Sequence, residues 1–476
     1  MKGPDLADVS VDAAPTPATA RRPIYFGWWL VGAAFTAQLI SVGAQNYVFG
    51  TFQTPMTDEL GWSRSEFVLA RTIGMGLFAF TGLFIGSYVD RHGGRRLMRA
   101  GIAILAAAML GQSYVQELWQ WWALNGVLLT TGAAMTGNLV VNVTVAKWFV
   151  EKRGRAVGIS AMGVSAAGIL ITPLASLLID DVGWREAWRW LALGAVLVIV
   201  PISFLMRRAP EDHGLHPDGK SADEVARGGG ARAAADFASS LTRGQAIRSR
   251  SFYFIVLAFG LGGLSIGTVL INGIPFMEDA GYSRTTGALM ITIASIPSMV
   301  TKPIWGYFID RLDARRMSVA GFILTAIALV TVVVSARNGA DLVLFAGFFI
   351  LGVGWGGFIP LQEVIWASFF GRRYLGAVRS AGMPFALGLS AGAPVLTALY
   401  FDQVGNYDGA FLAVAAFALV AVVLISFAAP PHRPDAGAPP THGDVAPASS
   451  PAPPPLEVAT ARAIDDPHGR QTSAST

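Results

Sequence analysis

Cysteine is absent from the sequence, which excludes disulfide bonds, iron–sulfur clusters and thiolate zinc sites. Histidine is scarce, and three of the six histidines lie near the C-terminus, at His432, His442 and His468. A histidine metal site is therefore not expected, and we predict neither a metal nor a cofactor. Charged residues make up only 14% of the 476 residues, whereas hydrophobic residues make up 53%. A soluble protein of this length would not be so apolar.

The sequence lacks the residues that several functional classes would need. The chain has no Walker-type nucleotide-binding loop, which disfavours ATP-driven transport. Its lysines and arginines lie in short loops between apolar segments rather than on one solvated face, so no binding of nucleic acid is expected. A hydrolase would pair a nucleophile with a base, yet no histidine falls within an apolar segment. We therefore predict that the protein is not an enzyme.

Long apolar runs make up most of the sequence. A helix needs about 20 apolar residues to cross about 30 Å of hydrocarbon, and only helices satisfy their backbone polar groups within one such segment. Candidate spans are 26–50, 66–89, 97–115, 120–147, 156–179, 187–206, 251–275, 284–308, 317–335, 342–367, 376–400 and 410–428. We predict an all-α membrane protein with twelve transmembrane helices.

The chain repeats itself at an offset of about 220 residues. The sequence GWSR at 61–64 returns as GYSR at 281–284, and GSYVDRHGGRR at 86–96 returns as GYFIDRLDARR at 306–316. Both anchors fall at matching points of two apolar units. Duplicated hydrophobic halves around a central site are typical of membrane carriers, so we predict two six-helix pseudo-repeats.

The distribution of cations predicts the orientation. If the N-terminus is cytoplasmic, most of the 35 lysines and arginines fall on the cytoplasmic side. Those on the opposite side are Arg64, Arg71, Arg185, Arg189, Arg284 and Arg337. By the positive-inside rule, we expect both termini to be cytoplasmic. We also expect an integral protein of a bacterial inner membrane, and one that functions as a monomer.

The same reasoning divides the chain into five parts. The predicted parts are a disordered N-tail at 1–25, a six-helix bundle at 26–206, a cytoplasmic linker at 207–250, a second bundle at 251–428 and a disordered C-tail at 429–476. We expect neither the linker nor the tails to carry chemistry.

The motif G-x-x-x-D-R-x-G-G-R-R at 86–96 resembles the loop signature between helices 2 and 3 of the major facilitator superfamily. Its degraded copy at 306–316 lies where that fold has a second one, and the resemblance covers roughly residues 24–430. An acid at a helix end beside an arginine cluster can lock two halves together on the cytoplasmic side. The predicted gating residues are Asp90, Arg91, Arg95, Asp310, Arg311 and Arg315.

A finer resemblance concerns FGTF at 49–52, GWSR at 61–64, KWF at 147–149 and RGRAVG at 153–158. These segments are similar to the monocarboxylate transporter family and its bacterial oxalate:formate antiporter relatives, which move organic anions, often with a proton. In that family an Arg-Pro pair in helix 8 is held to bind the substrate carboxylate.

This chain differs from that family at three positions. Lys302-Pro303 stands at the place of the Arg-Pro pair, which keeps the charge but loses the forked guanidinium. The mammalian members of that family place an Asp four residues earlier, where this chain has Ser298, and a lysine in helix 1, where it has Tyr47.

Lys302 is the main candidate for substrate binding. It lies eight residues before Asp310, or about 12 Å along the helix from its cytoplasmic end. An ionisable group at that depth is costly unless it is paired or faces water. We predict an anion-binding ammonium in the central cavity. The alternatives are an ion pair that packs helices, or a lysine that extends to the cytoplasmic surface.

Glu363 is the only acid well inside a predicted span. It could carry the coupled proton or hold Lys302 when no substrate is bound. The alternative is a gate or packing ion pair with Arg372 or Arg373. An offset of 221 residues relates Glu363 to Asn142, which we predict to line the cavity.

Tyr47 and Asn46 of the first span are further predicted cavity residues, because polar side chains in spans face the bundle interior. Arg71 lies about two turns from the outer end of its span and could attract anions at the outer mouth. We favour the alternative for Arg71, a salt bridge to Glu66, Glu59 or Asp58.

Together these features predict a secondary active transporter of a small organic anion, monocarboxylate-like, that couples uptake to protons by alternating access. Its partners would be the anion, protons and the lipid bilayer. The alternative is a drug or metabolite exporter of the same fold that exchanges its substrate for protons. Such exporters show G-x-x-x-G-P-x-x-G-G in helix 5, whereas 158–168 reads GISAMGVSAAG and lacks the proline and the final glycine pair.

Overall fold

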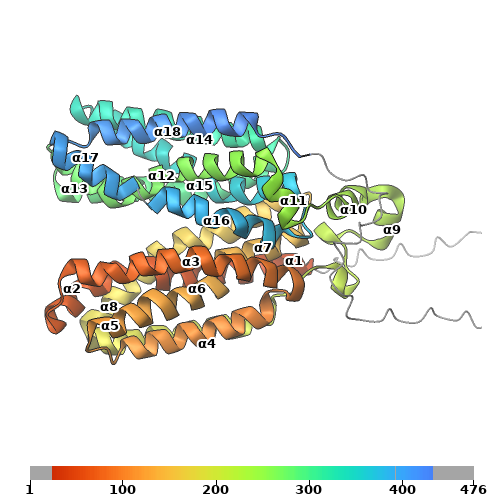
Figure 1. The fold of residues 1–476 in the computed structure, drawn as a ribbon, viewed down its shortest axis with the longest axis horizontal. Coiled ribbons are helices and arrows are strands. Elements are labelled where there is room, and N and C mark those ends of the chain that lie inside the picture. Colours follow the sequence, from red (N-terminus) through yellow and green to blue (C-terminus); the bar gives the residue numbers. More distant parts are fainter. Residues whose placement is uncertain (1–23, 392, 432–476) are drawn as a thin grey trace, which may run out of the picture. The chain divides into compact units, whose positions relative to one another are not determined.

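The computed structural model describes residues 24–391 and 393–431, and within them every regular element is a helix. Most of the N-tail and C-tail that the sequence predicts to be disordered lies outside the described residues. Figure 1 shows two helical bundles joined by a linker of short helices at one end.

The N-terminal bundle contains the first six spans. Its helices are α1 (Phe26–Val42), η1 (Gly43–Tyr47), α2 (Phe49–Leu60), α3 (Arg64–His92), α4 (Gly94–Gln112), α5 (Leu118–Trp121), η2 (Trp122–Leu129), α6 (Thr130–Thr136), α7 (Asn138–Trp148) and α8 (Arg153–Ser203). Spans five and six are both in α8, which is interrupted at Gly183, where φ is +79°. A positive φ costs glycine little, so this residue allows the break.

Short helices form the linker, and seven longer helices form the C-terminal bundle. The linker contains η3 (Glu211–His213), η4 (Pro217–Gly219), α9 (Ala222–Glu224), η5 (Val225–Gly229), α10 (Ala231–Ala238) and α11 (Arg243–Arg248). The bundle contains α12 (Arg250–Asp279), α13 (Arg284–Ile309), α14 (Ala314–Arg337), α15 (Asp341–Phe370), α16 (Leu375–Ala391), α17 (Ala393–Val404) and α18 (Asp408–Phe427).

Nine helices of the described residues are long and apolar enough to cross a membrane. The count falls short of twelve for visible reasons. The 51 residues of α8 hold two spans, α4 begins with Arg95, Arg96 and Arg99, and the span predicted at 376–400 is divided between α16 and α17. Each predicted span corresponds to helix, so the all-α architecture of twelve transmembrane helices is confirmed.

The first span differs from its predicted end at residue 50. After the π-helical turn η1, the chain continues as α2 to Leu60. Phe52 and Met56 are fully buried in α2, and the ring of Phe52 stacks on Trp188 with 4.0 Å between centroids. Burial of these two side chains stabilises helix beyond the apolar run, even though polar residues lie between them.

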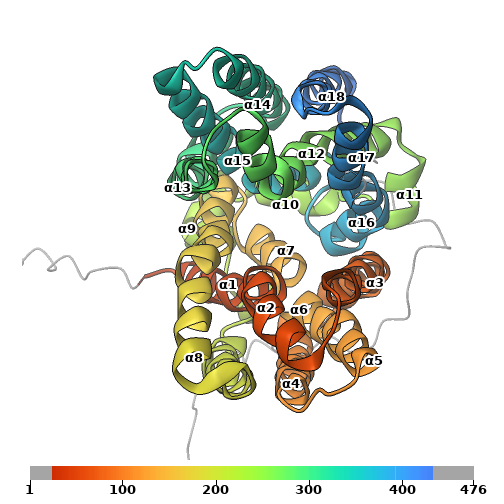
Figure 2. The same cartoon turned by 90° about the vertical axis from the view of Figure 1, so that its left-hand side faces the viewer.

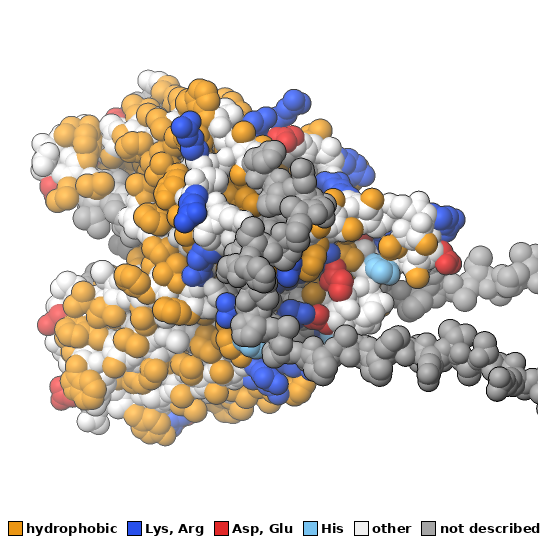
Figure 3. Space-filling model, turned by 45° about the vertical axis from the view of Figure 1, so that its right-hand side comes forward, with side chains coloured by type: hydrophobic (Ala, Val, Ile, Leu, Met, Phe, Trp, Pro, Cys, Tyr) orange, Lys and Arg blue, Asp and Glu red, His pale blue; other side chains and the backbone are white. Residues whose placement is uncertain are grey.

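The two bundles meet along two seams. Helix α3 packs against α16, and α8 packs against α13 (Figure 2). We call the end of the bundles that carries residues 207–249 the linker face. In Figure 3, Lys and Arg side chains gather toward this face while hydrophobic side chains cover the flanks of both bundles. Exposed residues such as Phe80 and Phe84 belong to that apolar belt, which is suited to lipid.

Candidate functional site

Asp90 joins the two bundles at the α3–α16 seam. It lies in the last turn of α3, where its buried carboxylate accepts hydrogen bonds from the backbone N–H groups of Gly376 (3.1 Å) and Ala377 (2.7 Å). Those donors belong to the first turn of α16, and the start of a helix favours a negative charge. The ammonium of Lys147 lies 2.7 Å from the same carboxylate.

Asp310 repeats this arrangement at the α8–α13 seam. Its carboxylate follows α13 and accepts hydrogen bonds from the backbone N–H groups of Gly154 (2.6 Å) and Arg155 (3.2 Å) in the first turn of α8. The Arg155 side chain pairs with it at 2.9 Å. Burial raises the pKa of the Asp310 carboxyl, and the hydrogen bonds from Arg155 and Gly154 oppose that rise. Both copies of the motif therefore cap a helix of the other bundle.

Glycines allow the helices to meet closely at these seams. A Cβ added to Gly86 would fall on the carbonyl oxygen of Gly376, and one added to Gly306 would fall on that of Gly154. Each of the four positions is equally crowded from the other side. The two seams are thus pseudo-symmetric copies in which backbone lies against backbone.

The arginines predicted as gates have partners only in their own bundle within the described residues. Arg91 is exposed, and Arg95 donates to the carbonyl of Phe204 at 2.6 Å. Arg311 lies 3.5 Å from the ring centroid of Tyr307, and Arg315 donates to the carbonyl of Ala428 at 3.1 Å. Among the described residues, the carboxylates of Asp90 and Asp310 contact the opposite bundle, whereas these four arginines make no such contact. A gating role for the arginines stays a prediction.

Lys302 lies at the α8–α13 seam, with only 3% of its surface exposed. Its ammonium donates to the Ser165 hydroxyl of α8 (2.6 Å), and to the carbonyl (2.9 Å) and hydroxyl (3.3 Å) of Ser298. Among the described residues no carboxylate lies within 4.0 Å of it. Neither alternative from the sequence therefore applies, because Lys302 forms no ion pair and does not extend to the surface.

Glu363 is fully buried in α15 and pairs with Arg379 of α16. The same carboxylate oxygen accepts a hydrogen bond from the Asn142 amide of α7 at 3.1 Å. The expected partners of Glu363 are therefore wrong: it contacts neither Lys302 nor the arginines of the 371–374 loop. Of these, Arg372 instead donates to the carbonyl of Lys147 at 3.2 Å.

Asn142 connects Glu363 to further polar groups of the N-terminal bundle. Its amide oxygen accepts from Gln38 of α1 (3.2 Å) and from Ser160 of α8 (3.5 Å). A buried polar chain therefore runs from α1 and α8 through Asn142 to α15 and α16, and crosses between the bundles. Within the described part of the chain, Glu363 Oε2 and Arg379 Nη1 have no hydrogen-bond partner, which is rare for buried polar atoms.

Arg379 is not among the site residues predicted from the sequence. It closely follows Arg372 and Arg373, so it is counted with the cytoplasmic cations of their loop. A signal was available, since position 379 falls inside the span predicted at 376–400. An arginine within a span requires a partner, and Glu363 is the buried acid at hand.

Arg71 and Asn46 lie together, with 3.0 Å between the guanidinium and the amide oxygen. The favoured salt bridge of Arg71 is wrong for the described residues. Glu66 is engaged in the capping box of Ser63, and Glu59 binds Trp184 and Arg185. These acids serve local structure instead.

Tyr47 occupies the π-helical turn η1 and packs against α8. A Cβ on Gly168 would lie 2.6 Å from the Tyr47 ring. Gly168 lies three residues after Ser165, so Tyr47 contacts the helix that provides the hydroxyl partner of Lys302.

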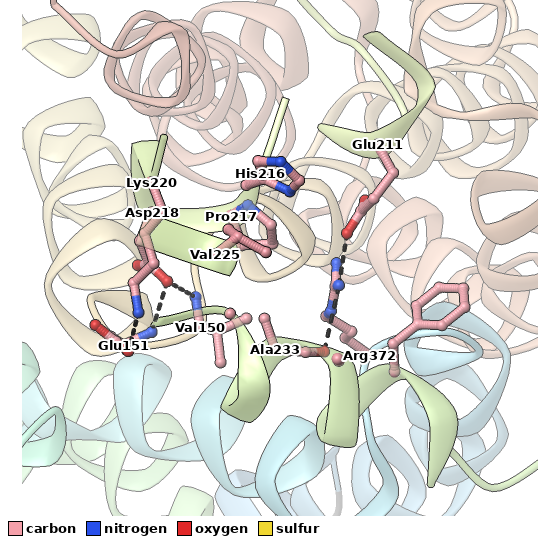
Figure 4. Close-up of a pocket in the computed structure, with 13 residues that line it drawn as sticks. Val150, Glu151, Glu211, His216, Pro217, Asp218, Lys220, Val225, Ala233 and Arg372 are labelled. Atoms are coloured by element: carbon pink, nitrogen blue, oxygen red, sulfur yellow. Dashed lines mark hydrogen bonds and ion pairs between the residues drawn. The ribbon is translucent and has the colours of Figure 1, made fainter. Parts of the chain in front are cut away.

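A cavity of about 340 Å³ opens at the linker face, between the linker and the loop after α7 (Figure 4). Its charged groups are already paired. Lys220 contacts Glu151, Arg372 contacts Glu211, and Asp218 accepts the backbone N–H groups of Val150, Glu151 and Lys152. None of the predicted substrate residues lines this cavity, so it is not the predicted central site.

The family model of the major facilitator superfamily matches residues 34–285 and 255–464. The oxalate:formate antiporter of Oxalobacter formigenes is 24% identical over 85% of this chain and 91% of its own length. Mouse (Mus musculus) monocarboxylate transporter 11 is 23% identical over 83% and 85%.

Solved structures share the fold. A double-tryptophan mutant of XylE gives a TM-score of 0.69 at 11% identity, and the match covers 86% of this chain and 97% of that one. The Escherichia coli fucose:proton symporter FucP gives 0.62 at 12% identity, with 84% and 99% covered. The family model matches most of the chain, and the solved structures and the two pseudo-symmetric seams agree with its fold. The chain therefore belongs to the major facilitator superfamily of membrane transporters.

Proposed function

We propose that this transporter carries a small organic anion of the monocarboxylate type and couples its uptake to protons. The observation that supports this most directly is Lys302, a buried ammonium whose three neighbours are neutral oxygens. A buried cation without a counterion is costly, and an anionic ligand would relieve that cost. Two relatives are named for the transport of small carboxylates: one for oxalate, a dicarboxylate, and formate, a monocarboxylate, and the other for monocarboxylates.

Alternating access would follow from the two seams. In this proposal the linker face is cytoplasmic, because the chain's cations gather there. Asp90 and Asp310 hold the bundles together at that face while substrate enters from the other side. Release requires both carboxylates to leave the helix starts of α16 and α8, after which the bundles rock apart around Lys302.

Glu363 is the proposed proton carrier. Protonation would remove the charge that holds Arg379 and weaken the hydrogen bond from Asn142, which crosses between the bundles. A proton on Glu363 would thereby loosen a contact between the bundles. Arg71 and Asn46, which lie far along their helices from the linker face, would guide anions at the outer mouth.

Uptake into proteoliposomes tests the proposed substrate class. The purified protein would be given a panel of labelled monocarboxylates, dicarboxylates, sugars and cationic drugs, each with and without an inward proton gradient. We expect saturable uptake of a carboxylate, stimulated by the gradient. Transport of sugars or cationic drugs only would contradict the proposal.

The proton role of Glu363 predicts loss of uphill accumulation when its carboxyl is removed. Glu363→Gln alone would leave Arg379 buried without its partner, at a cost of about 3–5 kcal/mol. The double substitution Glu363→Gln/Arg379→Gln avoids this. We expect it to keep exchange of labelled for unlabelled substrate while losing accumulation driven by a proton gradient. If the folded double variant still accumulates substrate uphill, Glu363 is not the coupling acid.

A further inference from the structure

The linker is anchored to both bundles. Asp236 pairs with Arg153 of the N-terminal bundle at 3.1 Å. A few residues later, the backbone N–H of Leu241 donates to the carbonyl of Phe370 at 2.9 Å, at the end of α15 in the other bundle. The short stretch 236–243 therefore has fixed contacts on both sides.

Arg243 makes the most direct of these contacts, because its guanidinium lies across the α3–α16 seam. On the α3 side it donates to the carbonyl of Leu83 (2.6 Å) and the hydroxyl of Ser87 (2.8 Å). On the α16 side it donates to the carbonyl of Ala377 (3.0 Å) and the hydroxyl of Ser380 (3.4 Å). One side chain thus binds both bundles at once.

The acceptors of Arg243 lie where α3 and α16 approach each other closely. Leu83 and Ser87 flank Gly86, and Ala377 follows Gly376, so Arg243 binds beside the point where the two backbones meet. Burial lowers the pKa of the Arg243 guanidinium. The negative charge of the nearby Asp90 carboxylate, which caps α16, opposes that lowering. Opening this seam would separate the acceptors and leave the guanidinium with at most half of them.

We propose that the linker is a clamp on the closed linker face, and that Arg243 is the residue through which it acts. Arg243 itself acts on one seam only, since its hydrogen bonds within the described residues go to α3 and α16 and not to α8 or α13. Closure of the linker face is therefore stabilised by a segment outside both repeats, in addition to the two aspartates that the repeats share. This inference concerns the balance between the two states of the carrier and does not depend on which substrate is moved.

Spin labels can measure that balance in the full-length protein. His92 and Leu312 are exposed, occupy equivalent positions of the two repeats and lie at the linker face. Because the chain has no cysteine, His92→Cys/Leu312→Cys provides the two labelling sites without further changes. The distance between the labels, measured by pulsed electron paramagnetic resonance in liposomes, reports whether this face is closed or open.

Arg243→Ala in this labelled background should raise the ratio of open to closed molecules by about tenfold, given the strength of hydrogen bonds to a charged group. Arg243→Lys, which keeps the charge but loses the fork, should give a smaller rise. The matched control is Arg248→Ala, since Arg248 belongs to the same linker helix and is exposed.

A purely structural role for Arg243 would give a different result. It would lower the melting temperature in Arg243→Ala without moving the distance distribution, and that outcome would overturn the proposal. An equal shift in Arg248→Ala would overturn it too, because any loss of linker charge would then suffice. Should Arg243→Ala not fold, the smaller shift expected of Arg243→Lys remains decisive.

Discussion

Lys302→Gln should strongly weaken binding and uptake of the carboxylate substrate while the protein remains folded. At the α8–α13 seam, the Lys302 ammonium is a positive charge with no carboxylate of the described residues within 4.0 Å, whereas Arg155 there is paired with Asp310. Loss of a buried charge–charge contact with the anion corresponds to about 2–5 kcal/mol, or a fall in affinity of about 30-fold to several thousandfold. Substrate binding to detergent-solubilised protein and initial uptake rates into proteoliposomes would both measure this loss.

Stability distinguishes a binding role from a structural one. If Lys302 served mainly to join α13 to Ser165 of α8, its replacement would destabilise the protein. A buried cation without a counterion instead carries a desolvation cost, so a neutral residue should leave the melting temperature unchanged or raise it. A variant that keeps its melting temperature and loses transport would support binding, whereas one that melts early would favour the structural role.

Two control variants sharpen this test. Lys302→Arg retains the positive charge and should retain a large part of the binding. Ser165→Ala removes the one hydrogen bond that Lys302 makes to the other bundle but keeps the cation, so substrate should still bind. Unchanged uptake by Lys302→Gln would show that the substrate is held elsewhere.

The repeat in the sequence predicted more of this site than any single motif did. The 220-residue offset related Asp90 to Asp310, and the structure gives them equivalent partners at the starts of α16 and α8. The 221-residue offset related Asn142 to Glu363, which in the structure bind each other. Residues close to a pseudo-twofold axis meet their own copies, whereas residues away from it do not.

The partners of these residues could not be predicted from the sequence, because they come from distant helices. Arg372 is near Glu363 in sequence, but nine residues of helix are about 13 Å, too far for an ion pair. The true partner Arg379 comes from the next helix, whose facing side the sequence does not determine. Arg71 shows a second limit, since the acids expected to bind it are engaged in a helix cap and in a contact to α8.

The linker shows a third limit. Its composition, rich in glycine, alanine and charge, is that of a flexible tether. The side-chain contacts of Asp236 and Arg243 depend on two bundles that exist only after folding. No periodicity within 207–250 could have indicated that one of its arginines binds both.

Gly86→Ala should shift the carrier strongly toward the state that is open at the linker face. The added Cβ would fall on the carbonyl oxygen of Gly376, which as backbone of α16 cannot rotate away. Overpacking of this kind costs about 1–3 kcal/mol, so the ratio of closed to open molecules should fall by about fivefold to 160-fold. The labels at positions 92 and 312 would measure the shift, and net uptake should slow in parallel because the cycle passes through the closed state.

The matched control for Gly86→Ala is Gly76→Ala. Gly76 lies in the same helix, and no atom lies within 4 Å of its added Cβ, so this variant should keep the native distribution. If Gly86→Ala keeps the native fraction of closed molecules, the seam accommodates the added Cβ without opening and the prediction is wrong.

Combining variants tests whether the two seams act independently. Gly306→Ala crowds the α8–α13 seam, which Arg243 does not contact, so its effect should add to that of Arg243→Ala. Gly86→Ala opens the seam that Arg243 spans, and once the acceptors on α3 and α16 are apart there is little left for Arg243→Ala to remove. We therefore expect the Gly86→Ala/Arg243→Ala pair to shift the distribution by less than the sum of its parts. Equal additivity in both pairs would mean that the linker acts on the bundles somewhere other than this seam.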